Sequence, residues 1–127
     1  MTFNRKFFFD FVRRQLFKGR LSQKQVDGLS YILKVWEGSH ASKDPRWLAY
    51  ALTTVHHETD ARIQPIHEYG GARYFTRMYD IKGERPHVAR QLGNICAGDG
   101  ALFHGRGYVQ LTGRANYEKV GRIFGID

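Results

Sequence analysis

The chain has 127 residues, 42% of them hydrophobic and 14% aromatic, a composition that predicts one globular domain over residues 1–127 and excludes a disordered chain. Twenty Lys and Arg against 12 Asp and Glu give a formal net charge of +8. That charge favours an anionic partner such as nucleic acid, a membrane surface or a cell-wall polymer, unless it serves solubility alone. Cys96 is the only cysteine, so an intrachain disulfide is excluded, and we interpret it as a structural thiol.

The first predicted helix, residues 3–18, is basic and aromatic. Its side chains expected to face inward are Phe8, Phe11, Val12 and Leu16. Such a helix could also lie on a membrane surface. Charged residues interrupt its apolar run, and no later stretch is apolar enough to span a bilayer. We therefore predict no signal peptide, no stable membrane insertion and a cytoplasmic location before release to a wall.

The second predicted helix begins at an S-x-x-Q capping box formed by Ser22 and Gln25. Its apolar residues recur at helical spacing: Val26, Leu29, Leu33 and Trp36. Gly38 predicts its C-terminal end. The opening of this helix, residues 21–29, is faintly similar to the first helix of a helix-turn-helix. The helical pattern continues where that motif needs a turn, so we expect no specific nucleic-acid binding.

The third predicted helix begins at Asp44, a good N-cap, with Pro45 at the first helical position. An apolar stripe follows at helical spacing: Leu48, Ala51 and Val55. Three residues further on, the stripe reaches Glu58. An inward carboxylate is desolvated, which raises its pKa toward the value that a general acid needs near neutral pH. The alternative is that Glu58 is only a helix-end charge turned to water.

After Glu68 the sequence changes to a long, irregular, glycine-rich segment with interspersed aromatic residues, from residue 70 to residue 107. Loops this long in a compact domain are usually functional. A short helical turn is predicted over residues 87–92. Residues 108–111 are either a strand or the start of a buried helix, and a final helix is predicted over residues 116–124.

Several catalytic motifs are excluded. H-E-x-x-H fails because Ala61 stands where the second histidine is required, and neither a nucleotide-phosphate loop nor a G-x-S-x-G elbow occurs. The histidines that could still meet around a metal are His56, His57, His67 and His104. Their spacing matches no recognised ligand pattern, so we predict no metal and no organic cofactor, and we expect His57 to hydrogen-bond near the helix end.

Glu58 and Glu68 form the best remaining constellation. Glycoside hydrolysis needs one carboxylic acid to protonate the leaving oxygen and a second carboxylate to act as base or nucleophile. Pro65 bends the chain between the two glutamates, so they could face each other across a groove. Tyr and Trp side chains suit stacking against sugar rings.

Three blocks of the sequence are distinctive: HHETDARIQPIHEYGG, YFTRMYD and GDGALFHGRGYVQLTGRANYEKVGRIFGID. Together with LSQKQVDGLSYILKVWE and DPRWLAYALTTVHHET they resemble glycoside hydrolase family 19, the chitinase family, and within it the branch of phage endolysins and bacterial cell-wall lysins. The resemblance covers most of residues 7–127. It implies a mainly α-helical, two-lobed, lysozyme-like fold with a central substrate cleft, shortened at the C-terminus relative to the family.

The resemblance also implies roles for single residues. Glu58 matches the general acid, Glu68 the general base, and Thr112 the hydroxyl that helps to hold the attacking water. Gln110 and Asn116 match polar positions that line the sugar site. We also assign Tyr108 and His57 to substrate binding. The family inverts the anomeric configuration, so the two carboxyl groups are expected roughly 6.5–9.5 Å apart.

The sequence departs from the family pattern at three places. His67 stands where Arg or Lys commonly precedes the second glutamate, Asp60 replaces a common glycine, and the chain ends at Asp127 where relatives continue. Asp60 would raise the pKa of Glu58 further by placing a second carboxylate nearby. A missing cleft wall would weaken substrate binding.

The sequence therefore predicts a peptidoglycan-cleaving glycoside hydrolase that acts on β-1,4 bonds. The net charge of +8 favours an anionic wall over neutral chitin, which stays open as the alternative substrate. A catalytically inert glycan-binding remnant is the second alternative. A lysin of this kind would need a holin-like partner to reach the wall.

Overall fold

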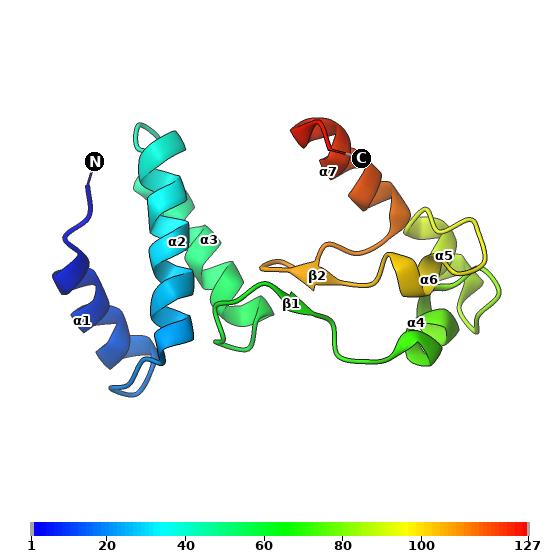
Figure 1. The fold of residues 1–127 in the computed structure, drawn as a ribbon, viewed down its shortest axis with the longest axis horizontal. Coiled ribbons are helices and arrows are strands. Elements are labelled where there is room, and N and C mark those ends of the chain that lie inside the picture. The colour runs from blue at the N-terminus through cyan, green and yellow to red at the C-terminus, as the bar shows by residue number, and fades with distance from the viewer. Residues whose placement is uncertain (1, 127) are drawn as a thin grey trace. The chain divides into compact units, whose positions relative to one another are not determined.

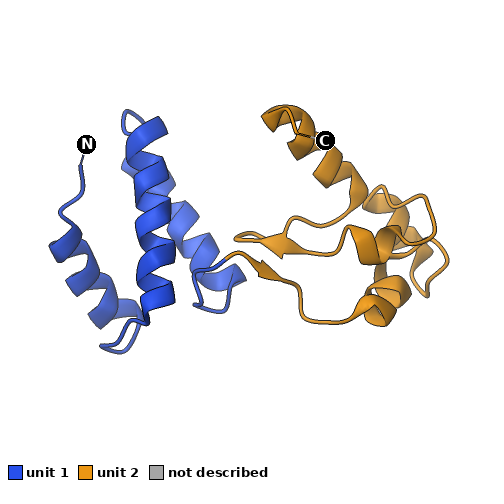
Figure 2. Ribbon diagram, viewed as in Figure 1, with its two compact units in different colours: residues 1–64 blue, residues 65–127 orange. Residues whose placement is uncertain are grey.

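The computed structural model describes residues 2–126, and the chain is mainly helical, which confirms the predicted mainly α class (Figure 1). It divides into two compact units, unit 1 (Met1–Gln64) and unit 2 (Pro65–Asp127), shown in Figure 2. Unit 1 contains three helices within its described residues: α1 (Arg5–Leu16), α2 (Gln23–Ser39) and α3 (Pro45–Glu58). The elements described in unit 2 are β1 (Ile66–His67), α4 (Ala72–Tyr79), α5 (Pro86–Gln91), α6 (Asp99–Leu102), β2 (Arg106–Gly107) and α7 (Arg114–Phe124).

The caps that start the helices of unit 1 lie where local sequence places them. The capping box of α2 is complete, because Ser22 accepts from the backbone N–H of Gln25 while the Gln25 side chain accepts from the backbone N–H of Ser22. Asp44 caps α3 by accepting from the backbone N–H of Arg46, and Pro45 occupies the first turn. Both predicted starts are confirmed.

The core of unit 1 is a cluster of Leu33, Trp36 and Leu48, with partly buried apolar side chains packed around it. In α1, Val12 is buried and Phe8 is half-buried, as expected. Phe11 and Leu16 were expected inside, and this is wrong, since they are 50% and 55% exposed. Val12 already occupies the inward line of α1, and Phe11 lies one residue away from it, about 100° around the helix.

The inward placement predicted for Glu58 is also wrong. Leu48 and Val55 are buried, but Ala51 and Glu58 are exposed. Four residues after Val55, Thr59 continues the stripe instead and is fully buried at 0% exposure. The apolar stripe therefore ends on a hydroxyl beyond the last helical residue, and Glu58 points to solvent at the end of α3.

A strained turn after α3 closes unit 1. Asp60, Ala61 and Ile63 all have positive φ, which is costly for residues with a Cβ and most costly for a β-branched one. The turn is held because the Thr59 hydroxyl donates to Val55 O at 2.7 Å and accepts from Ile63 N–H at 2.9 Å. Hydrogen bonds of the Thr59 hydroxyl to residues four positions away on either side therefore help to maintain this conformation.

Unit 2 contains helices within a segment that we predicted to be irregular. The turn predicted over 87–92 is confirmed as α5, whereas α4 and α6 were not anticipated. The aromatic residues of α4 fall at helical spacing, so Phe75 turns inward at 4% exposure. Residues 108–111 are neither strand nor helix, since residues 108–110 form a turn and Leu111 makes an isolated bridge to Arg106.

Two short strands connect parts of unit 2 that are far apart in the sequence. β1 and β2 pair antiparallel, with Ile66 opposite Gly107 and His67 opposite Arg106. α4 packs mainly against α6 and α5. Across residues 2–126, no helix combines the length and apolarity that crossing a membrane requires.

Candidate active site

Glu68 leaves strand β1 and is held by three hydrogen bonds. Its backbone N–H donates to Gly105 O at 2.7 Å, and its Oε2 accepts from the Gly105 N–H at 3.2 Å. Its Oε1 accepts from the Tyr79 hydroxyl at 2.7 Å. The side chain is half-buried, so both carboxylate oxygens have defined positions within unit 2.

Tyr79, the last residue of α4, was not singled out from the sequence as a site residue. Burial and the hydrogen bond to Glu68 raise the pKa of Tyr79 to about 12, because a phenolate would lie beside a carboxylate. The hydroxyl therefore stays protonated at neutral pH and remains a donor. It occupies Oε1 and leaves Oε2 on the side of Gly105.

The space beside Gly105 is where the predicted residues of unit 2 meet. A Cβ added to Gly105 would lie 2.9 Å from Gln110 Oε1, 3.0 Å from Glu68 Oε2 and 3.0 Å from Thr112 Oγ1. Three oxygen atoms from three parts of the chain thus surround one point, and only glycine leaves that point open. Glu68 and Gly105 are 37 positions apart in the sequence, so the β1–β2 pairing creates this arrangement.

Gln110 and Thr112 are fixed by bonds to the backbone. Gln110 has a φ of +55° in the turn after β2, and its Nε2 donates at 3.1 Å to Ile66 O and to Gly107 O. The Thr112 hydroxyl donates at 3.1 Å to Gln110 O, so its oxygen is left as an acceptor on the side of Gly105. These three acceptors therefore face Gly105, and a hydrogen-bond donor that meets them would lie beyond the Cβ position, which is only one bond length from Gly105 Cα.

The other residues predicted for unit 2 lie near this group with different roles. Asn116, exposed in the first turn of α7, donates from Nδ2 to Thr112 O at 2.8 Å and so supports the Thr112 backbone. Tyr108 is half-buried in the same turn as Gln110. Sequence reasoning thus selected Glu68, Gln110 and Thr112, which the fold brings together, and Asn116, which contacts one of them.

Glu58 and His57 belong to unit 1, where both are exposed at the end of α3. The His57 carbonyl accepts from the Asp60 N–H at 3.2 Å, so its backbone takes part in the turn after α3. His56 is half-buried with its ring 5.3 Å from that of Phe17. The role of Glu58 as an acid stays a prediction.

Two of the four histidines considered as ligands do meet. His67 Nδ1 lies 3.2 Å from His104 Nε2, and His104 Nδ1 lies 2.7 Å from Ala101 O. Because a carbonyl only accepts, His104 Nδ1 carries a proton, and in the neutral ring Nε2 accepts from His67. The His104 ring also stacks on Phe75 at 4.4 Å. Among residues 2–126, no group of three or more potential ligands could hold a metal ion.

Buried acids hold the loops on which the candidate site depends. Two hydrogen bonds from Arg114, the shorter 2.6 Å, lower the pKa of Asp99 to about 2 and tie α6 to the start of α7. Burial acts to raise the pKa of Asp80, but backbone N–H groups, among them that of Gly98 at 2.7 Å, outweigh it and lower the pKa. Both carboxylates therefore stay ionised inside unit 2.

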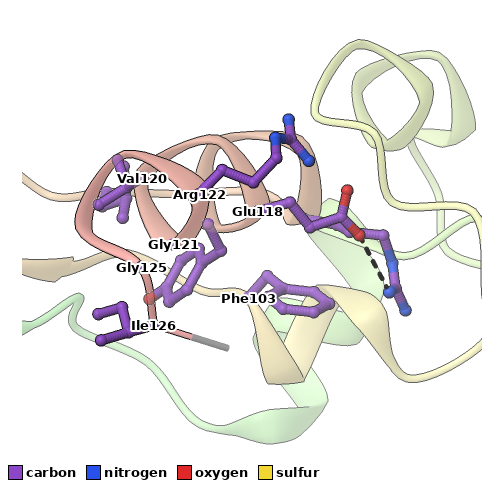
Figure 3. A pocket seen from close by; sticks show the side chains of 10 residues that line it. Phe103, Glu118, Val120, Gly121, Arg122, Gly125 and Ile126 are labelled. Carbon is purple, nitrogen blue, oxygen red and sulfur yellow. Dashed lines mark hydrogen bonds and ion pairs between the residues drawn. The ribbon is translucent and has the colours of Figure 1, made fainter.

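A hollow of about 710 Å³ lies along α7 (Figure 3). Its lining is mostly apolar, with Phe103 and Ile126 among the residues labelled in the figure, and Glu118 bonded to Arg114 at 3.5 Å. None of the residues around Gly105 lines it. We therefore place the candidate site at Gly105, where the polar groups converge, and not in the hollow along α7.

The candidate site is thus a carboxylate, an amide oxygen and a hydroxyl fixed around one glycine, with a tyrosine on the far carboxylate oxygen. The signal for Glu68, Gln110 and Thr112 was their place in distinctive sequence blocks. Tyr79 and Gly105 had no separate signal, although both lie within such blocks. Comparisons with known proteins found no family model, no curated protein and no solved structure that matches the chain.

Proposed function

We propose that this protein is a glycoside hydrolase that cleaves β-1,4 bonds in the glycan strands of peptidoglycan by an inverting mechanism. The observation that supports it is the convergence of Glu68 Oε2, Gln110 Oε1 and Thr112 Oγ1 beside Gly105. A carboxylate beside a hydroxyl acceptor suits the binding and deprotonation of one water. The proposal includes a two-lobed, lysozyme-like arrangement with a central cleft.

In the proposed reaction Glu68 acts as the general base. The water gives a proton to Oε2 and its oxygen attacks the anomeric carbon, while the bond to the leaving oxygen breaks on the opposite face. Glu58 is the proposed acid that gives a proton to that leaving oxygen. The products are two shorter glycans, one with an inverted anomeric centre, and one proton must move from Glu68 to Glu58 through solvent before the next turnover.

Tyr79 would act on this reaction through Glu68. Its hydroxyl donates to Oε1, so the carboxylate cannot rotate freely and Oε2 stays on the side of Thr112. Tyr79 is thus a positioning residue.

The net charge of the protein is our reason for proposing peptidoglycan as the substrate. A protein with a net charge of +8 is attracted to an anionic polymer, and peptidoglycan is anionic where chitin is neutral. Release from the cytoplasm through a holin-like partner would bring the enzyme to its substrate.

The test is loss of turbidity in Gram-negative cells whose outer membrane has been permeabilised. We expect the wild type to lyse them, and we expect Glu58→Gln and Glu68→Gln each to lower the rate by roughly 100-fold or more, because each removes one proton transfer. Glu84→Gln is the matched control, since Glu84 is exposed and is 3.9 Å from Arg77 in a surface pair.

The other outcomes separate the alternatives. Lysis that persists in Glu58→Gln would remove Glu58 as the acid. A folded wild type that leaves cells intact but shortens chitin oligomers would change the substrate to chitin. Retention on glycan without turnover of either polymer would favour an inert binding remnant.

A further inference from the structure

Helix α1 exposes two phenylalanines on a face that does not pack against the core cluster of unit 1. Phe7 is 69% exposed and Phe11 is 50% exposed, although Val12 of the same helix is buried. The two rings stack on each other with centroids 6.3 Å apart and planes at 20°. A single exposed apolar side chain is ordinary, but a stacked aromatic pair is a patch.

The geometry of α1 explains why these rings cannot join the core. Residues four apart share a helix face, so Phe7 and Phe11 form one outward ridge. Phe8 lies on the inner side and packs against the core cluster of unit 1. The outward pair thus contributes nothing to the burial of that cluster.

Exposed cations lie on the same helix as the ridge and in the turn that follows it. Arg14 is exposed and its Nε donates to Asp10 O at 3.1 Å, which holds the side chain close to the helix. Lys6 and Arg13 are 89% and 46% exposed and flank Asp10, the one acid on the helix. Lys18 and Arg20 follow in the exposed turn after α1. Helix α1 and its following turn therefore combine an exposed apolar ridge with a surplus of exposed cations.

The apolar ridge and the exposed cations together favour one kind of binding partner over others. A second copy of the chain would bring the same cations face to face, which opposes self-association. A nucleic acid would satisfy the cations but offers no apolar layer for two rings that already stack on each other. A bilayer with anionic lipids offers phosphates at its surface and acyl chains just beneath them.

We propose that α1 is a peripheral docking face for anionic lipid bilayers, with Phe7 and Phe11 entering the interface and the exposed cations contacting lipid phosphates. The helix lies in the plane of the interface and does not span the bilayer. This surface is independent of Glu58 and Glu68, so it stands or falls without the proposed hydrolase activity.

The test is sedimentation of the full chain with vesicles of phosphatidylcholine alone, or of phosphatidylcholine and phosphatidylglycerol in equal parts. We expect binding to the anionic vesicles that salt weakens. The double variant Phe7→Ala/Phe11→Ala should bind roughly 100-fold more weakly, since burial of each ring is worth about tenfold. Tyr31→Ala/Tyr50→Ala is the control, since these residues are exposed on α2 and α3 at 59% and 78%.

A second pair of variants tests the charges. Arg14→Gln/Lys18→Gln should weaken binding by roughly 30-fold, at about fivefold for each cation near an anionic surface. Lys24→Gln/Lys34→Gln makes the same change in net charge on the exposed side of α2 and should leave most of the binding intact. Equal losses in the two pairs would show that only net charge matters and would overturn the proposal.

Three more results would overturn it. These are wild-type binding to the two vesicle types with equal strength, full binding by Phe7→Ala/Phe11→Ala, and binding of duplex DNA by the wild type without binding of vesicles. Circular dichroism of each variant confirms that α1 is still helical, so a loss of binding reports on the surface.

Discussion

Different interactions stabilise the interiors of the two units. Unit 1 packs three capped helices around an apolar cluster of Leu33, Trp36 and Leu48. Unit 2 has short elements, and the polar side chains of Asp80, Asn94 and Asp99 are nearly or fully buried between them. Helix packing tolerates exchange of surface residues, whereas a buried polar group is costly if one partner is lost. The candidate base and its neighbours lie in the unit whose buried side chains include these hydrogen-bonded polar groups.

The largest effect expected from a single change is on unit 1. A Cβ at Gly28 would lie 1.8 Å from Ile63 O, so Gly28→Ala forces α2 away from the strained turn and should lower the free energy of unfolding by at least about 3 kcal/mol. Gly38→Ala is the control: nothing lies within 4 Å of its Cβ, and alanine favours the helix. Denaturant unfolding measures both, and similar stabilities for the two variants would contradict the close contact.

The next effect is on unit 2. Asp99→Asn removes the charge that accepts two hydrogen bonds from Arg114 and should cost about 3 kcal/mol, because Asp99 is 2% exposed. Asp10→Asn breaks ion pairs on the surface of α1 and should change the melting temperature little. A larger drop in melting temperature for Asp10→Asn than for Asp99→Asn would contradict the greater cost of losing a buried acid in unit 2.

Acid should separate the units as well. The pKa of Asp99 is about 2 in the folded chain, below the ordinary value of 3.8, so its stabilisation is present above about pH 4 and is lost as the pH falls to about 2. This linkage is worth about 2 kcal/mol. In NMR spectra taken at falling pH, the Gly100 amide of unit 2 should lose its native shift before the Leu33 amide of unit 1. The opposite order would show that buried acids do not limit unit 2.

The smallest effect is expected at Tyr79. Tyr79→Phe removes one hydrogen bond to Glu68 and should reduce the rate of lysis about tenfold, because Oε1 loses the donor that positions the carboxylate. A merely structural role would lower the melting temperature together with the rate, so thermal unfolding is measured beside lysis. Tyr74→Phe in the same helix is the control, because no hydrogen bond from its hydroxyl to Glu68 occurs in the described structure. This prediction holds only if the proposed hydrolase activity is found.

The sequence alone determined the elements whose signals are local. The capping box of Ser22 and Gln25, the Asp44 cap and the Pro45 start all act within one helical turn, so short-range pattern was enough to find them. The same holds for Val12, Leu33 and Leu48 as core residues, because a 3.6-residue period determines which side chains share a face. Local pattern also indicated α7, predicted from residue 116 and observed from residue 114.

Only the tertiary structure decided what distant residues do to one another. The meeting of Glu68, Gln110 and Thr112 beside Gly105 depends on β1 pairing with β2, across 37 positions between Glu68 and Gly105. The exposure of Glu58, the burial of Thr59 and the contact of Gly28 with Ile63 likewise follow from packing after the end of α3. Hydrogen bonds and contacts between segments depend on the three-dimensional path of the chain, and no periodicity within one segment encodes that path.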